Sequence, residues 1–206
     1  MTERVRLSFD RIAEQYAADF ADELSRKPYD VALLRRFATR CAGAVLDVGC
    51  GPAGHVGRFV ADLGPRVVGV DLSARSLAVA RRLNPALDFV AADMATLPFA
   101  SGGCGAIVAF YSLIYEADPT AALVELRRVL RPGGCLLVAV HAGQGFQHFR
   151  DYKGLPVDVE LHLRSPDTLA AQLTRARFRT ETVDVRPPYP FEHATDRLYV
   201  MARADS

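Results

Sequence analysis

Short apolar runs alternate with helical patterns of hydrophobic residues along most of this chain, from about residue 45 onward. The apolar runs predict strands, and apolar residues at intervals of three and four predict the helices between them. The strands are expected at 45–48, 66–70, 87–91, 106–110 and 135–140, with two more near 178–186 and 197–203, and the helices at 55–63, 74–83, after Asp118 and at 165–176. Repeated alternation of this kind favours an α/β fold with a doubly wound, mostly parallel sheet.

The first forty residues follow a helical pattern. An amphipathic stripe is formed by Leu7, Phe9, Ile12, Tyr16 and Phe20, and a second helical pattern follows Pro28. We therefore expect an N-terminal helical arm over 1–40 that covers a single domain over 41–206. Residues 157–163 alternate apolar and polar positions, which is typical of a half-buried strand.

Composition narrows the class of protein. The chain has 206 residues, half of them hydrophobic, and a formal net charge of +1, so one globular domain is expected and nucleic acid is not an expected partner. Cys41, Cys50, Cys104 and Cys135 show neither C-x-x-C pairs nor metal-like spacing with histidine. A reducing, cytoplasmic setting without a metal site follows. No apolar run reaches the ~20 residues of a membrane span, and no signal sequence is expected.

The segment 45–55 carries the most specific chemistry. A short buried strand containing Asp47 leads into Gly49, Gly51 and Gly54 at G-x-G-x-x-G spacing, and a helical pattern follows. Strand, glycine turn and helix form the layout of a nucleotide-cofactor site, because glycine admits a close ligand and the helix N-terminus offers free N–H groups. The glycines alone are weak evidence, and the preceding carboxylate makes them informative.

Two kinds of cofactor are candidates for binding at this loop. Asp71 lies at the end of the next strand, close to the ~20-residue spacing of an acid that binds ribose hydroxyls, and Asp93 ends the strand after it. A dinucleotide would place its pyrophosphate near Asp47, which is unfavourable. S-adenosylmethionine has no phosphate and carries a cationic sulfonium and amino group, so the same carboxylate favours it.

Four ordered motifs strengthen the second choice. They read Val-Leu-Asp-Val-Gly-Cys-Gly, Val-Val-Gly-Val-Asp-Leu-Ser, Ala-Ala-Asp-Met-Ala-Thr-Leu-Pro-Phe and Arg-Val-Leu-Arg-Pro-Gly-Gly, spanning roughly residues 45–140. This set resembles the class I S-adenosylmethionine-dependent methyltransferases, in particular their small-molecule branch. The resemblance implies a seven-stranded Rossmann-like sheet that ends in an antiparallel hairpin, and S-adenosylmethionine as the cofactor.

The resemblance also implies roles for individual residues. The methionine part of the cofactor would lie against Gly49, Cys50 and Gly51, with Asp47 near its amino group and Phe110 near the sulfonium. The ribose would meet Asp71, and the adenine would meet Leu72, Asp93 and Met94, while Tyr16 resembles a tyrosine that caps the cofactor carboxylate. Three positions depart from the family pattern: Ala53 lies inside the glycine loop, Gly103-Cys104-Gly105 stands where the family commonly has Ser-Phe-Asp, and Arg177 stands where the family has a left-handed glycine.

Methyl transfer from a sulfonium is an in-line displacement, so a general base is needed only if the acceptor keeps its proton. His141, directly after the fifth strand, is the candidate base, and Tyr115 is a candidate hydrogen-bond partner for the acceptor. The acceptor pocket is expected to draw on the arm, the loop after the fourth strand and the 141–164 segment, including Tyr111, Ser112, Tyr115, His141, Gln144, His148, Tyr152, Glu160 and His162.

The main expectation is transfer of a methyl group to a small-molecule acceptor. An NAD(P)-dependent oxidoreductase and a non-catalytic S-adenosylmethionine-binding protein stay open, as do a monomer and a homodimer.

Overall fold

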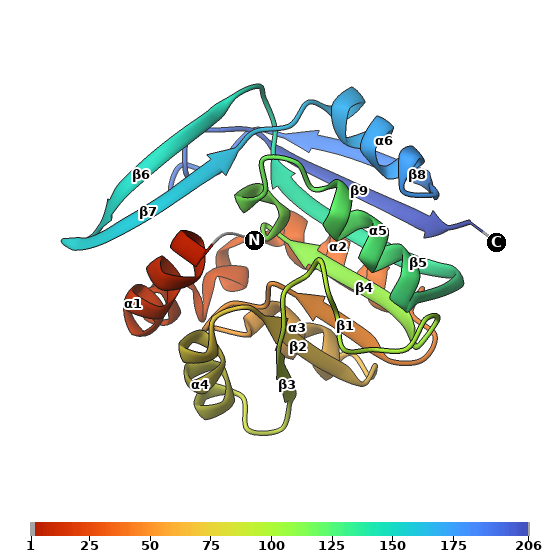
Figure 1. Ribbon diagram of the computed structural model, residues 1–206, viewed down its shortest axis with the longest axis horizontal. Helices are drawn as coiled ribbons and strands as arrows, with labels where there is room; N and C mark the ends of the chain where they lie inside the picture. The colour runs from red at the N-terminus through yellow and green to blue at the C-terminus, as the bar shows by residue number, and fades with distance from the viewer. Residues whose placement is uncertain (1–2, 206) are drawn as a thin grey trace.

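The sheet predicted from the alternating pattern is present in the computed structural model, which describes residues 3–205 (Figure 1). Its seven strands lie in the order β3-β2-β1-β4-β5-β9-β8, and all pairs are parallel except those made by β9. The strands are β1 Val45–Val48, β2 Val67–Asp71, β3 Asp88–Ala91, β4 Cys104–Phe110, β5 Leu130–His141, β8 Phe178–Arg186 and β9 Arg197–Ala204. The doubly wound fold with an antiparallel last hairpin is therefore confirmed.

Helices cover both faces of the sheet. In Figure 1, α5 (Thr120–Val129) and α6 (Pro166–Arg175) lie on the near face, and α2 (Pro28–Ala38) and α3 (His55–Asp62) lie behind it. Their buried faces build two separate cores, which include Leu123 and Leu126 on one side and Leu34 and Phe37 on the other. The sheet is thus buried on both faces, which explains the nearly unbroken hydrophobic runs in its central strands.

Local capping begins several helices where the sequence predicts them. Ser73 accepts a hydrogen bond from Ser76 N ahead of α4 (Ala74–Leu83), and Ser165 accepts one from Thr168 N ahead of α6. Pro166 occupies the first turn of α6, where its missing N–H leaves no bond unmade.

The first helix of the N-terminal arm and a β-hairpin lie together beyond the carboxyl ends of the central strands (Figure 1). The arm consists of α1 (Glu3–Phe20), the short 3₁₀ helix η1 (Glu23–Arg26) and α2, and the hairpin of β6 (Phe146–Tyr152) and β7 (Leu155–His162). Ser8 of α1 accepts a hydrogen bond from Asp158 N at 2.8 Å, and Arg4 pairs with Glu160 at 3.0 Å. On its other side α1 packs against α4, where Asp10 accepts a hydrogen bond from Ser73 Oγ at 2.6 Å.

Two details differ from the sequence prediction. Strand β5 begins at Leu130, directly after α5, because the segment predicted as a helix stop pairs with β4 across a register shift. Strand β6 was not predicted, since its polar residues alternate in a hairpin outside the main sheet.

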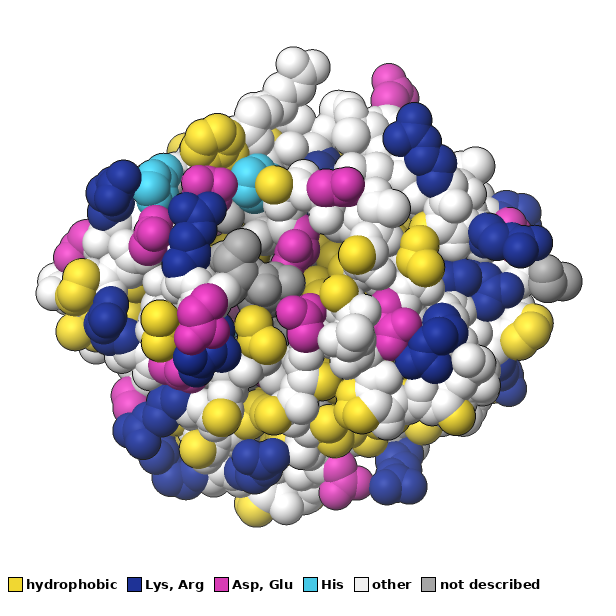
Figure 2. Space-filling model, viewed as in Figure 1, with side chains coloured by type: hydrophobic (Ala, Val, Ile, Leu, Met, Phe, Trp, Pro, Cys, Tyr) yellow, Lys and Arg dark blue, Asp and Glu magenta, His cyan; other side chains and the backbone are white. Residues whose placement is uncertain are grey.

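Basic and acidic side chains are interspersed over the face in Figure 2, in keeping with the near-neutral net charge. Within residues 3–205, no helix is long and apolar enough to cross a membrane.

Candidate functional site

A cavity of about 550 Å³ opens at the carboxyl ends of β1 and β4, where the strand order changes direction. This is the place at which doubly wound sheets bind ligands, and the volume falls in the ~300–1,000 Å³ range of ligand pockets. The glycine loop forms one wall, and α1, η1, the hairpin and the loop between β8 and β9 form the others.

The glycine loop owes its shape to three left-handed residues. Gly49, Gly51 and Gly54 have φ values of 75°, 62° and 57°, a region that favours glycine. A Cβ at Gly49 would lie 2.2 Å from Cβ of Ser112, whose hydroxyl donates to Val48 O at 2.6 Å. Gly54 stands immediately before α3, so it is the third glycine of the motif, and Ala53 is a buried residue preceding it.

Asp47 lies beneath the loop and is only 2% exposed. Its Oδ2 atom has no hydrogen-bond partner among residues 3–205. Burial raises the pKa of this carboxyl to about 7, opposed by the Gly57 N–H and reinforced by the carboxylate of Asp71. A Cβ at Gly57 would lie 2.9 Å from Asp47 Oδ2, so this glycine, which the motif did not indicate, makes room for the carboxylate. The site therefore holds a buried acid ready to meet a cation.

Asp71, at the end of β2, ties the loop to the next helix. Its Oδ2 accepts from Gly51 N and its Oδ1 from Ser73 N, both at 2.9 Å. Burial raises the pKa of Asp71, and these two N–H groups oppose the rise. Each oxygen keeps a further lone pair for a ligand hydroxyl.

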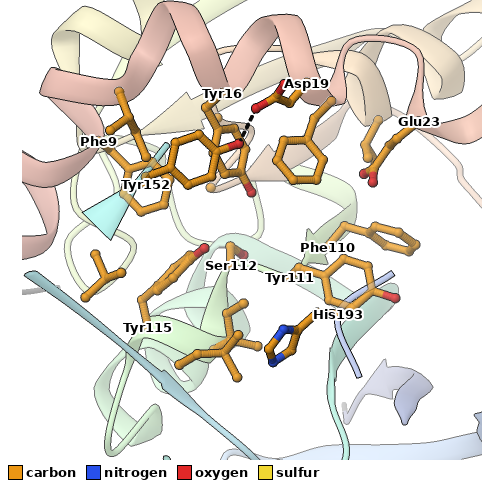
Figure 3. A pocket seen from close by; sticks show the side chains of 18 of the residues that line it. Phe9, Tyr16, Asp19, Glu23, Phe110, Tyr111, Ser112, Tyr115, Tyr152 and His193 are labelled. Atoms are coloured by element: carbon orange, nitrogen blue, oxygen red, sulfur yellow. Dashed lines mark hydrogen bonds between the residues drawn. The ribbon is translucent and has the colours of Figure 1, made fainter. Parts of the chain in front are cut away.

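Aromatic rings form the wide part of the cavity (Figure 3). Phe9 of α1 lies edge-on to Tyr16 at 5.5 Å and to Tyr115 at 5.1 Å, and Tyr16 lies 5.6 Å from Tyr152 of the hairpin. The Tyr152 hydroxyl donates to Asp19 at 2.6 Å, the contact drawn in Figure 3. This wall suits an apolar, planar ligand.

Two histidines also line the cavity, His141 at the end of β5 and His193 in the loop between β8 and β9. His141 Nδ1 is 2.5 Å from Thr195 Oγ1, and the His141 and His193 rings are 5.8 Å apart. Burial lowers the pKa of His141 to about 3, helped by Arg197, which pairs with it in the β5–β9 register. His193 likewise has a lowered pKa, through burial and Arg197. Both imidazoles are therefore neutral near pH 7, and His141 is a poor proton acceptor.

A buried ion cluster that the sequence did not reveal borders the cavity through Glu23, Lys27 and Glu192. Lys27 Nζ lies 2.8 Å from Glu23 and 3.1 Å from Glu192, and Arg186 pairs with Glu192 at 2.7 Å and with Asp30 at 3.2 Å. Arg186 and Asp30 stand 156 residues apart in the sequence, so no local pattern of residues indicated this cluster.

Most of the predicted site residues come together here. The cavity is lined by Tyr16, Asp47, Gly49, Cys50, Gly51, Asp71, Phe110, Tyr115 and His141, and from the expected acceptor pocket also by Tyr111, Ser112 and Tyr152. Leu72, Asp93 and Met94 are not among the described lining residues, and Met94 is buried in the core that includes α5. Gln144, His148, Glu160 and His162 also lie outside it; His148 pairs with Asp158 at 2.6 Å.

Comparisons with known proteins agree with this geometry. A family profile described as a methyltransferase domain matches residues 46–138. The malonyl-[acyl-carrier protein] O-methyltransferase of Enterobacter lignolyticus is 36% identical over 146 residues, covering 71% of this chain and 57% of that protein. The demethylmenaquinone methyltransferase of Renibacterium salmoninarum is 36% identical over 160 residues, covering 70% of this chain and 66% of that protein.

The chain thus spans about three fifths of the length of these curated relatives. Among solved structures, a SAM-dependent methyltransferase of Methanosarcina mazei has a similar fold, with a TM-score of 0.71 at 20% identity over 79% of this chain and 92% of that one. The matched motifs, the sheet order and the glycine loop over a buried acid coincide in one molecule. The chain belongs to the class I S-adenosylmethionine-dependent methyltransferases.

Proposed function

We propose that the protein transfers a methyl group from S-adenosylmethionine to a small-molecule acceptor bound in the aromatic part of the cavity. The observation that carries this proposal is the continuity of the cavity, which joins Asp47 and Asp71 at the glycine loop to the rings of Phe9, Tyr16 and Tyr115. In this proposal residues 1–40 cover the acceptor and residues 41–206 form the cofactor-binding domain.

The residues at the loop fit the cofactor. The unpaired Oδ2 of Asp47 suits a cationic amino group, and the space beside Gly51, where a Cβ would meet no atom within 4 Å, admits the chain of the ligand. Asp71 would accept from the ribose hydroxyls, and Tyr16 and Phe110 would flank the methionine part. Leu72, Asp93 and Met94 stay predicted adenine contacts. When bound, S-adenosylmethionine supplies an electrophilic methyl group on its sulfonium.

The acceptor would be held between α1 and the hairpin. The relatives' names give acyl-carrier-bound malonate and demethylmenaquinone as their acceptors, so the family accommodates both an acid and an aromatic ring system. The ring-lined wall of this cavity favours the aromatic class. Tyr115, whose pKa burial raises to about 12, would contact the acceptor as a neutral phenol. His141 would contact it as a neutral imidazole, and its low pKa opposes the role of base that its position suggested.

Calorimetry with S-adenosylmethionine tests the cofactor half of the proposal. Wild type should bind, and Asp71→Ala should abolish binding because the loop loses its anchor and the ribose its acceptor. The matched control is Asp88→Asn, at the start of β3, whose carboxylate is 65% exposed and pairs only with Arg66 among described residues. Binding of NAD(P) with none of S-adenosylmethionine would instead favour the oxidoreductase alternative.

A metabolite screen for release of S-adenosylhomocysteine tests the acceptor half. Release with an aromatic small molecule is expected. Binding of the cofactor without turnover on any acceptor would leave a non-catalytic S-adenosylmethionine-binding protein as the function.

A further inference from the structure

Three side chains lead in line from the cavity wall into the protein interior. Tyr111 lines the cavity and lies beside His193 in Figure 3. Its hydroxyl is 2.9 Å from that of Tyr199 on β9, and the Tyr199 hydroxyl is 2.5 Å from Asp30 Oδ1 on α2. Tyr199 is 1% exposed and Asp30 is 0% exposed, and neither is among the described residues that line the cavity. Tyr111 thus connects the cavity, through Tyr199, to a buried carboxylate.

The direction of the hydrogen bonds follows from counting protons. Tyr199 donates its single hydroxyl hydrogen to Asp30 and accepts from Arg186 Nε at 3.1 Å. The bond between the two tyrosines must therefore use the hydrogen of Tyr111. The Tyr111 oxygen keeps lone pairs that can accept a hydrogen bond. Both hydroxyl hydrogens are therefore donated toward Asp30, an order of hydrogen bonds along which a proton can pass from Tyr111 to Asp30.

The backbone holds Tyr111 in this place under strain. Its φ is 55°, a left-handed value that a bulky side chain rarely adopts. Tyr111 N donates to Ala139 O at 2.8 Å, which fixes the residue to β5. Such strain persists where the surrounding structure requires one side-chain position, here at the end of β4 beside the glycine loop.

Asp30 is suited to receive the proton. Its Oδ1 also accepts from Arg186 Nη2 at 3.2 Å, while Oδ2 has no hydrogen-bond partner among residues 3–205 and lies 4.0 Å from Lys27 Nζ. Burial raises the pKa of Asp30, although Tyr199, Lys27 and Arg186 oppose the rise. Burial thus favours proton uptake by Asp30, whereas His141, with a pKa of about 3, holds a proton poorly.

We propose that the acceptor is a phenol-type hydroxyl compound and that Tyr111 takes its proton, which the hydroxyl of Tyr199 relays to Asp30. This inference rests on the proposed function. The ring-lined wall receives the aromatic body of the acceptor, and the Tyr111 oxygen receives its hydroxyl hydrogen. Tyr111 is then a catalytic residue, and Tyr199 and Asp30 act through it.

The step balances without any oxidant or reductant. The acceptor O–H bond breaks and its proton goes to the Tyr111 oxygen, while the Tyr111 hydrogen moves to Tyr199 and the Tyr199 hydrogen to Asp30. The acceptor oxygen forms a bond to the methyl carbon, the carbon–sulfur bond breaks, and its electron pair stays on sulfur. The products are a methyl ether, a thioether and a neutral Asp30 carboxyl group.

Conservative tyrosine variants separate the relay from simple contact with the acceptor. Methylation of phenol, para-chlorophenol, para-cyanophenol and para-nitrophenol would be measured with wild type, Tyr111→Phe, Tyr199→Phe and both together. Tyr199 touches no acceptor, so a loss of kcat in Tyr199→Phe reports on proton transfer. The matched control is Tyr29→Phe, because the Tyr29 ring packs 5.1 Å from that of Tyr199 while its hydroxyl bonds to Asp184, outside the relay.

Both relay variants should lower kcat on phenol about 100-fold or more, the scale of general base catalysis, with little change in KM. The loss should shrink across the series and vanish for para-nitrophenol at a pH where that acceptor is already ionised. The double variant should be no slower than either single one, because the residues act as a unit. Equal losses for all four phenols, or wild-type kcat in Tyr199→Phe, would overturn the relay.

The two proposals fail in distinguishable ways. S-adenosylmethionine binding with no methylation of any phenol would refute the acceptor class named here and leave the proposed function standing. Absence of S-adenosylmethionine binding would refute the proposed function itself.

Discussion

Asparagine at position 47 should change the pH dependence of stability in a way that can be worked out from the structure. Asp47 is 2% exposed, and burial raises its pKa from 3.8 to about 7. A difference of about three units, at 1.36 kcal/mol each, corresponds to about 4 kcal/mol. Between pH 4 and 7 the folded protein keeps a proton that the unfolded chain has released. The free energy of unfolding contributed by this group is therefore full below pH 4 and is lost as the pH rises to about 7.

Asp47→Asn has the same shape and cannot titrate, so it lacks this loss. Relative to wild type, the free energy of unfolding of the variant should increase by up to about 4 kcal/mol between pH 4 and 8. Urea unfolding followed by circular dichroism at half-unit pH intervals measures the difference. Gly57→Ala, which crowds the same carboxylate without removing it, is the comparison. Parallel stability curves for wild type and Asp47→Asn would refute the reasoning.

Asp47→Asn should weaken binding of the cofactor, although the same substitution raises the free energy of unfolding. A cationic amino group near Asp47 favours the ionised carboxylate, so ligand binding at pH 6.5 should release protons from wild type and none from Asp47→Asn. Calorimetry of S-adenosylhomocysteine in buffers of different ionisation enthalpy measures this release. Unchanged affinity and unchanged proton release in the variant would place the amino group elsewhere.

Three further outcomes are expected. Arg177 has φ 63° after α6, so Arg177→Gly should raise the free energy of unfolding by about 1 kcal/mol in urea titrations, and a fall would contradict the strain. Gly57→Ala should weaken S-adenosylhomocysteine binding at least about tenfold by calorimetry, because its Cβ would lie 2.9 Å from Asp47 Oδ2 and overpacking of this kind costs ~1–3 kcal/mol. Burial raises the pKa of all four thiols, to about 11 for Cys135. Ellman's reagent at pH 8 should therefore react slowly with the native protein and rapidly with the protein unfolded in urea. Rapid labelling of the native protein would contradict this burial.

The sequence by itself determined the sheet, the glycine loop and the family. Strand and helix periodicities are local, and they predicted every strand of the main sheet to within a few residues except the early start of β5. The glycine turn and the positions of Asp47 and Asp71 at the ends of strands are set by neighbouring residues in the chain. The sequence pattern alone therefore predicted them. The burial of Asp47 and the lack of a partner for its Oδ2 among residues 3–205 depend on the packing of α3 against β1. The glycine motif did not indicate the role of Gly57, which lies in that helix.

Only the tertiary structure decided the environment of Asp30, Tyr111 and His141. Asp30, Arg186 and Tyr199 meet across 156 and 169 residues of sequence, and no periodicity predicts such contacts. Burial of His141, together with the β5–β9 pairing that places Arg197 beside it, lowers the pKa of this histidine and makes it a poor base. The left-handed backbone of Tyr111 likewise follows from its bond to β5. Electrostatic environment depends on distance in space, and for these residues the fold alone sets that distance.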